Sequence, residues 1–320
     1  MTLDRRTLLK GLTAGTALAM AGAPALAQAP KTIKVAILKV VGNAHPLHYE
    51  RLAPPGYKFE LVWVPSPAAA KDAVATGSAD FALGGVVAAI LGNANGEPVV
   101  VVSNLTGASM AVIAKAGGPI RKFADLKGKK VGLQPGSTQD LVVAERLKQE
   151  GMKPADIQVV RLGLGEMHAA LGRGDLDAYV GTEPGSSMSV MDGIGQLVEH
   201  PYGTEIGDLV TAVMANADVV KKDPKKVHDF VLTHARATEY LKANLDAWEA
   251  DGTKTFGLKP EIFKVAIKNI TTDWKMDETF VRRAGAFGRL MLENKMIRRL
   301  PTEDFIQTKF VQDVARAGLG

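Results

Sequence analysis

The chain has 320 residues, a hydrophobic content of 46% and a net charge of +5. That hydrophobic fraction is typical of a water-soluble globular protein. Cysteine does not occur, which excludes thiol catalysis, iron–sulfur clusters and cysteine zinc sites. The basic residues are scattered and aromatic residues make up only 6% of the chain, so nucleic acid is not an expected partner.

The N-terminal segment has the pattern of a secretory signal. Arg5 and Arg6 precede an apolar stretch at 11–23, and small residues at 25–27 form a cleavage site. Paired arginines favour the Tat route. A short membrane anchor is the alternative, but a spanning helix needs about 20 apolar residues. We expect a Tat signal peptide at 1–27 and a protein free in the periplasm, since no cysteine is available for a lipid anchor.

Strands and helices alternate from residue 31 to about residue 180, which predicts an α/β fold with parallel sheets. After residue 208 an apolar strand is followed by helices to the end of the chain. Such a tail has no sheet of its own and must pack on an existing lobe. The predicted strands are 33–38, 59–64, 81–83, 98–102, 131–133, 157–162, 178–180 and 209–214, and the longest predicted helices are 136–151, 277–294 and 301–317.

An internal repeat indicates that two lobes share one plan. Residues 73–84 align without gaps on residues 170–181. The positions shared by the two copies are Ala73 and Ala170, Gly77 and Gly174, Asp80 and Asp177, and Gly84 and Gly181. Chance similarity between α/β units is the alternative, but identical residues at fixed spacing favour a true repeat.

Several segments together carry a resemblance to a known family. In chain order they are 73–84, Asp125–Gly132, Gly136–Thr138, Pro154–Val160, Ala170–Ala178 and Glu183-Pro184. On these segments the chain resembles the periplasmic solute-binding proteins of nitrate, aliphatic-sulfonate and taurine ABC importers, a family that includes thiamine-precursor binders. One departure concerns the substrate: Ile37-Leu38-Lys39 stands where sulfonate binders often carry a polar or aromatic pair.

The resemblance implies the type II periplasmic binding protein fold, with two Rossmann-like lobes joined by two crossover strands near 110–114 and 209–214. The first lobe would then comprise 28–110 and a helix-rich second part at 215–320, and the second lobe would comprise 111–214. The implied function is to bind a small anionic solute of the sulfonate, taurine or nitrate class between the lobes. The implied partners are a membrane permease and its ATPase, and the protein would be a monomer without a cofactor or enzymatic activity.

Ligands of open α/β lobes bind at the carboxyl ends of strands. First-turn amides of the helix after residue 136 suit an anion, although an ordinary cap is the alternative. An acid after the strand at 178–180 could accept a hydrogen bond from a ligand amine or hydroxyl, or be a solvated loop carboxylate. The glycine pair could be a tight turn, and the lysine a solvated charge. The candidate ligand-binding residues are Lys39, Asn43, Gly84, Gly85, Gly136, Ser137, Thr138, Thr182 and Glu183.

Two other functional classes stay open at this point. One is a periplasmic enzyme on the same bilobal fold, and the other is a ligand-sensing subunit. The thiamine-pyrimidine synthases that resemble these binders depend on a cysteine-rich motif, which a chain without cysteine lacks. The six histidines show no metal-binding spacing beyond one weak pair, His45 and His48. We therefore expect a binding protein without a metal.

Overall fold

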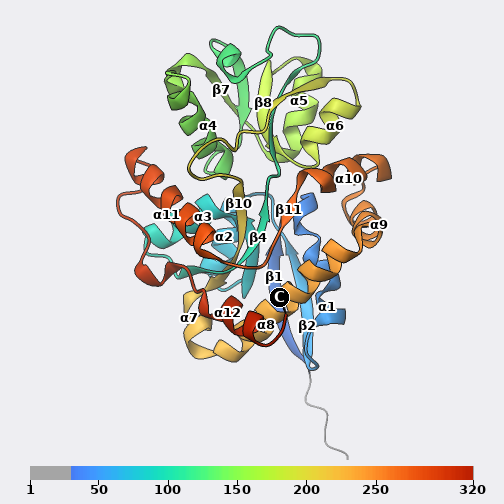
Figure 1. Ribbon diagram of the computed structural model, residues 1–320, viewed down its shortest axis with the longest axis vertical. Helices are drawn as coiled ribbons and strands as arrows, with labels where there is room; N and C mark the ends of the chain where they lie inside the picture. Colours follow the sequence, from blue (N-terminus) through green and yellow to red (C-terminus); the bar gives the residue numbers. More distant parts are fainter. Residues whose placement is uncertain (1–29, 320) are drawn as a thin grey trace, which may run out of the picture.

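The computed structural model describes residues 30–319, so the expected signal peptide at 1–27 and its cleavage site lie outside the described residues. In this part of the chain no helix is both long enough and apolar enough to cross a membrane. The chain forms two α/β lobes, one above the other in Figure 1, each built on one mixed sheet. Two α/β lobes are what the sequence predicts.

The first lobe is built on a six-stranded sheet with the order β11-β4-β10-β3-β1-β2. β1 pairs in parallel with β2 and β3, whereas β10 runs antiparallel to β3 and β4. The apolar run at 99–102 lies buried within β4, as expected for a central strand covered on both faces. The strands are β1 Lys31–Ile37, β2 Tyr57–Trp63, β3 Phe81–Gly85, β4 Val99–Gly107, β10 Leu209–Asn216 and β11 Thr271–Thr272.

The second lobe is built on a five-stranded sheet with the order β7-β6-β8-β5-β9. β6 is parallel to β7 and β8, and β5 is antiparallel to β8 and β9. The strands are β5 Met110–Lys115, β6 Lys130–Leu133, β7 Gln158–Arg161, β8 Ala178–Thr182 and β9 Gly195–Glu199, and the helices are α4 Thr138–Gln149, α5 Met167–Arg173 and α6 Gly185–Met191.

The helix-rich tail packs on the first lobe, which therefore contains both the blue and the red ends of the chain in Figure 1. Phe230 of α8 stacks on Phe81 of β3 with 3.7 Å between ring centroids. Phe287 of α11 and Phe310 of α12 belong to the same core. The helices of this lobe are α1 Tyr49–Leu52, α2 Pro67–Ala75, α3 Val86–Ala94, α7 Ala217–Lys222, α8 Pro224–Ala243, α9 Leu245–Phe256, α10 Pro260–Ala266, α11 Glu278–Glu293 and α12 Lys309–Arg316.

The chain passes between the sheets at two neighbouring places. On the way out only Ala108 and Ser109 separate β4 from β5. The return segment leads from β9 into β10, and its Asp208 carbonyl accepts a hydrogen bond from the Ala108 amide at 2.9 Å. A Cβ on Gly107 would lie 2.6 Å from that same carbonyl oxygen, so glycine permits this close approach. The domain limit expected at 110 coincides with the first residue of β5, and the limit expected at 214 falls inside β10. β10 is a central strand of the first sheet.

The internal repeat corresponds to the same local structure in both lobes. Asp80 Oδ2 accepts from the amide of Lys34 on β1 at 2.9 Å, and Asp177 Oδ2 accepts from the amide of Lys130 on β6 at 2.8 Å. Gly174 ends α5 in the left-handed conformation with φ 82°. Each repeat therefore joins the end of a helix to the start of a neighbouring parallel strand.

Candidate functional site

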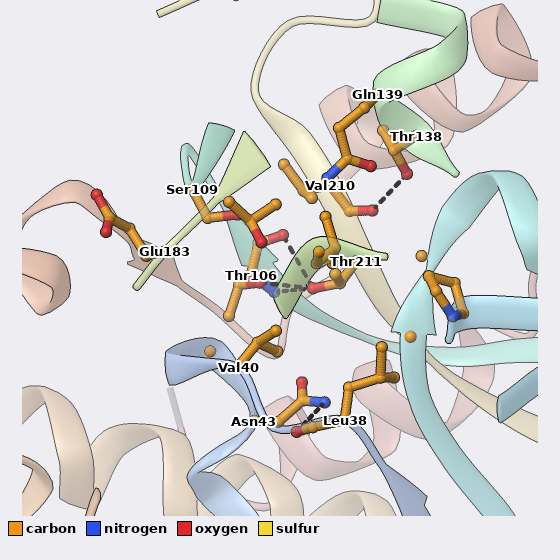
Figure 2. A pocket seen from close by; sticks show the side chains of 16 residues that line it. Leu38, Val40, Asn43, Thr106, Ser109, Thr138, Gln139, Glu183, Val210 and Thr211 are labelled. Atoms are coloured by element: carbon orange, nitrogen blue, oxygen red, sulfur yellow. Dashed lines mark hydrogen bonds between the residues drawn. The ribbon is translucent and has the colours of Figure 1, made fainter. Parts of the chain in front are cut away.

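A cavity of about 50 Å³, partly open to solvent, lies between the two sheets. Figure 2 shows the 16 lining residues, which come from strand ends of both lobes and from both crossings. They are Leu38, Val40, Gly42, Asn43, Pro67, Gly84, Gly85, Thr106, Ser109, Thr138, Gln139, Leu164, Thr182, Glu183, Val210 and Thr211.

Six of the nine residues predicted from the sequence line this cavity, namely Asn43, Gly84, Gly85, Thr138, Thr182 and Glu183. Lys39 does not, because its exposed side chain extends over the Trp63 ring, with Nζ 5.8 Å from the ring centroid. Gly136 and Ser137 lie beside the cavity without lining it. The prediction located the strand ends, but it could not tell which side chains there turn inward.

The first-lobe wall carries Asn43, which ends the short 3₁₀ helix Val41–Asn43 directly after β1. Asn43 is 1% exposed, and its Nδ2 donates to the carbonyls of Leu38 and Leu83, each at 3.4 Å. Its Oδ1 is buried and has no hydrogen-bond partner among the described residues. The cavity therefore contains a buried acceptor that the protein itself does not satisfy.

The N-terminus of α4 forms part of the second-lobe wall. Ser137 Oγ donates to the carbonyl of Gln134 at 2.7 Å, and Thr138 Oγ1 donates to the carbonyl of Val210 at 3.1 Å. The Gly136 amide is already bound by Asp140 Oδ2 at 2.7 Å, and burial raises the pKa of that carboxyl. In the described part of the chain no hydrogen bond is found for the backbone amides of Thr138 and Gln139, the two residues of this turn that line the cavity.

Glu183 follows β8 and lies at one side of the cavity, with its carboxylate directed away from the other labelled side chains in Figure 2. Its Oε1 accepts from Asn269 Nδ2 at 2.7 Å, and its Oε2 accepts from the Ser187 amide at 3.1 Å. Burial raises the pKa of Glu183, which is 2% exposed. Asn269 belongs to the first-lobe tail, so this carboxylate joins the two lobes.

Three hydroxyl residues of the cavity were missed by the sequence analysis: Thr106, Ser109 and Thr211. They lie on β4, in the outgoing link and on β10, and the Oγ1 atoms of Thr106 and Thr211 are 2.6 Å apart. A polar residue inside an otherwise apolar crossing segment was the signal available in the sequence. Among the described residues that line the cavity, Glu183 alone has an ionisable side chain.

The family of the chain follows from a comparison with known proteins. The family model described as "NMT1/THI5 like" matches residues 56–247, which include the second lobe and every lining residue after Asn43. The chain belongs to the NMT1/THI5-like family. This NMT1/THI5-like protein contains, within its described residues, no cluster of histidine and acidic side chains arranged to hold a metal ion.

Relatives of this NMT1/THI5-like protein differ in their described functions. It is 25% identical over 262 residues to the putative aliphatic sulfonates-binding protein of Escherichia coli, which covers 79% of this chain and 80% of that one. It is 24% identical over 240 residues, 66% and 69% of the two chains, to the yeast 4-amino-5-hydroxymethyl-2-methylpyrimidine phosphate synthase THI5. The crystal structure of the periplasmic aliphatic sulphonate binding protein SsuA from Escherichia coli matches with a TM-score of 0.72 and 23% identity, over 85% of this chain and 90% of SsuA.

Proposed function

We propose that the chain is the periplasmic solute-binding component of an ABC importer, which captures a small molecule between its lobes and delivers it to a membrane permease. The observation that carries this proposal is the cavity itself. Its lining combines Asn43, Gly85 and Thr211 of the first lobe with Thr138 and Thr182 of the second. A ligand held by both walls favours the closed arrangement of the lobes, and closure is the signal that a permease can recognise.

The chemistry of the cavity favours binding over catalysis. Hydroxyls, backbone amides and apolar side chains surround the cavity, and the two acceptor oxygens of its one carboxylate are already hydrogen-bonded. Acid–base catalysis needs a titratable group within reach of the substrate. A synthase activity like that named for the yeast relative would rest here on a chain without cysteine. A sensor that passes the closed form to a membrane receptor would use the same cavity.

A small organic anion of the sulfonate class fits the second-lobe wall. The amides of Thr138 and Gln139 lie in the first turn of α4, where the helix dipole favours negative charge. Anion binding by neutral donors of this kind does not require a lysine or arginine. Export by the Tat route, a monomeric state and an ATPase that serves the permease complete the proposal.

Native mass spectrometry of the protein purified from its host periplasm tests the proposal directly. We expect a bound small molecule that is lost on denaturation, and its mass identifies the solute. A chain that is isolated without any ligand and binds no member of a panel of sulfonates, carboxylates and nitrate would contradict the proposal.

A matched pair of glycine variants tests whether the cavity must close. A Cβ on Gly85 would lie 3.3 Å from Thr138 Oγ1 of the opposite lobe, whereas a Cβ on Gly203 would have no atom within 4 Å. We expect Gly85→Leu to weaken ligand binding by about ten- to a hundredfold, because overpacking costs ~1–3 kcal/mol in the closed form. Gly203→Leu should bind as wild type in isothermal titration calorimetry. Equal affinities for the two variants would show that the lobes need not approach at Gly85.

A further inference from the structure

The side chain of Asn43 has a fixed orientation. Its Nδ2 has two hydrogens, and the carbonyls of Leu38 and Leu83 lie 3.4 Å away to accept them. A flipped amide would turn Oδ1 toward two carbonyl oxygens, which is repulsive and leaves both carbonyls without that donor. The hydrogen-bond network therefore sets the nitrogen toward the protein and the oxygen toward the cavity, as Figure 2 shows.

The oxygen that faces the cavity needs a donor from outside the protein. Asn43 is 1% exposed and Oδ1 has no hydrogen-bond partner among the described residues, so the protein itself supplies no donor to this oxygen. A buried acceptor without a partner destabilises the state in which it is left unpaired. A ligand group that donates to Oδ1 removes this cost, whereas an anionic oxygen at the same place adds electrostatic repulsion.

The opposite wall has the complementary character. Thr138 and Gln139, in the first turn of α4, lie on the side of the cavity across from Asn43 (Figure 2). Their backbone amides have no hydrogen bond among the described residues. Val40, Leu38 and Val210 contribute apolar surface between these two walls. The cavity thus has an unpaired acceptor on the first lobe and first-turn amides on the second lobe. Apolar side chains and the hydroxyls of Thr106, Ser109 and Thr211 lie between them.

We propose that Asn43 determines specificity by requiring a hydrogen-bond donor on the ligand, such as an ammonium or hydroxyl group, at the end opposite the anionic group. The preferred ligands are therefore amino- or hydroxy-substituted small organic anions, not simple alkyl anions or inorganic anions. This inference rests on the proposed solute-binding function and names the ligand class of that site. It also moves the partner of the ligand donor from Glu183, whose oxygens are engaged by Asn269 and Ser187, to Asn43.

Three sulfonates of nearly equal size test the inference by calorimetry. They are 2-aminoethanesulfonate, 2-hydroxyethanesulfonate and ethanesulfonate, and only the last lacks a donor. We expect the wild-type protein to bind each donor-bearing probe about ten- to a hundredfold more tightly than ethanesulfonate. Ethanesulfonate binding as tightly as the other two overturns the inference, and so does a failure of all three to bind.

The variant Asn43→Leu has a side chain of similar volume but no hydrogen-bond acceptor. Its preference for donor-bearing probes over ethanesulfonate should therefore fall to about threefold or less. Val40→Ala serves as the matched control, because it changes the same wall without touching a polar atom and should leave the ratio of affinities as in wild type. A preference that persists in Asn43→Leu overturns the inference. If thermal unfolding shows that Asn43→Leu does not fold, the wild-type ratio decides alone.

The outcome for Asn43 and the outcome for the proposed function can be told apart. A solute without a donor, recovered from the native protein by mass spectrometry, overturns the inference about Asn43 and leaves the transport function standing. Absence of any captured solute, together with no binding to the wider panel, overturns both.

Discussion

The two lobes share their scaffold and differ at the cavity. Asp80 in the first lobe and Asp177 in the second accept the same kind of bond, from a backbone amide of the adjacent parallel strand. At the carboxyl end of the strand that follows, the lobes diverge. After the shared glycine, Gly84 or Gly181, the first lobe presents the bare backbone of Gly85, whereas the second presents Thr182 and Glu183. The repeated aspartates thus support the fold, and the two walls of the cavity differ from Gly85 and Thr182 onward.

We expect the lobes to differ also in their stability at low pH. His45 and His234 are fully buried in the first lobe, where burial lowers the pKa of His45 and lowers that of His234 to about 4. The carboxyls with raised pKa, Asp140 and Glu183, lie in the second lobe. The first lobe should therefore be the acid-sensitive one.

The largest effect we expect is a loss of stability between pH 7.5 and pH 5. A histidine whose pKa is lowered from 6.5 to about 4 stabilises the folded state above pH 6.5, and this contribution is lost as the pH falls toward 4. His234 alone accounts for roughly 2 kcal/mol at pH 5. Asp140 and Glu183 act in the opposite direction, because their folded forms take up protons more readily than the unfolded chain.

Hydrogen exchange followed by mass spectrometry at both pH values resolves the two lobes. Amides of β1, β3 and β4 should lose protection at pH 5 before those of β6 and β8. His234→Gln should reduce the difference, since Gln does not titrate. Uniform loss of protection in both lobes would mean that the lobes unfold as one unit.

A smaller and nearly equal loss of stability is expected when either of the two repeated aspartates is removed. Asp80→Ala and Asp177→Ala should each lower the free energy of unfolding by about 1 kcal/mol, because each removes a charge-assisted bond that is partly screened by solvent. Asp80→Ala should cost slightly more, since Lys226 Nζ also lies 2.5 Å from Asp80 Oδ1. Urea unfolding measures both, and ligand affinity should not change. A larger loss of unfolding free energy for Asp177→Ala than for Asp80→Ala would contradict the equivalence of the repeats.

The smallest effect concerns the bond that joins the lobes. Glu183→Gln and Asn269→Leu should each weaken ligand binding by about two- to tenfold, since each removes one hydrogen bond that favours the closed form. The double variant should be no weaker than either single variant, because both act on the same bond. A hundredfold loss for Glu183→Gln with normal binding by Asn269→Leu would instead place the carboxylate on the ligand.

Much of the fold could be predicted because its main strands and helices have clear periodic patterns. The strand expected at 33–38 is β1 Lys31–Ile37, and the helix expected at 277–294 is α11 Glu278–Glu293. The edge strands β9 Gly195–Glu199 and β11 Thr271–Thr272 were not predicted. An edge strand of mixed polarity or of two residues has too few apolar positions for a period to show.

The candidate site was predicted less well for a geometric reason. The rule that ligands lie at strand ends led to Asn43, Gly85 and Thr182, which line the cavity. Whether a side chain at such an end turns inward depends on the loop conformation, which the local sequence does not determine. Lys39 and Trp63 illustrate this, because the lysine follows the ring away from the cavity.

The hydrogen bond between the Ala108 amide and the Asp208 carbonyl has a mechanical consequence. Two chain segments that are hydrogen-bonded side by side form a hinge with one axis. We therefore expect the lobes to rotate about that axis with little twist or sliding. A membrane partner that binds one lobe could then open the cavity by rotating the other lobe about this axis. Unloading would need no contact between that partner and the cargo.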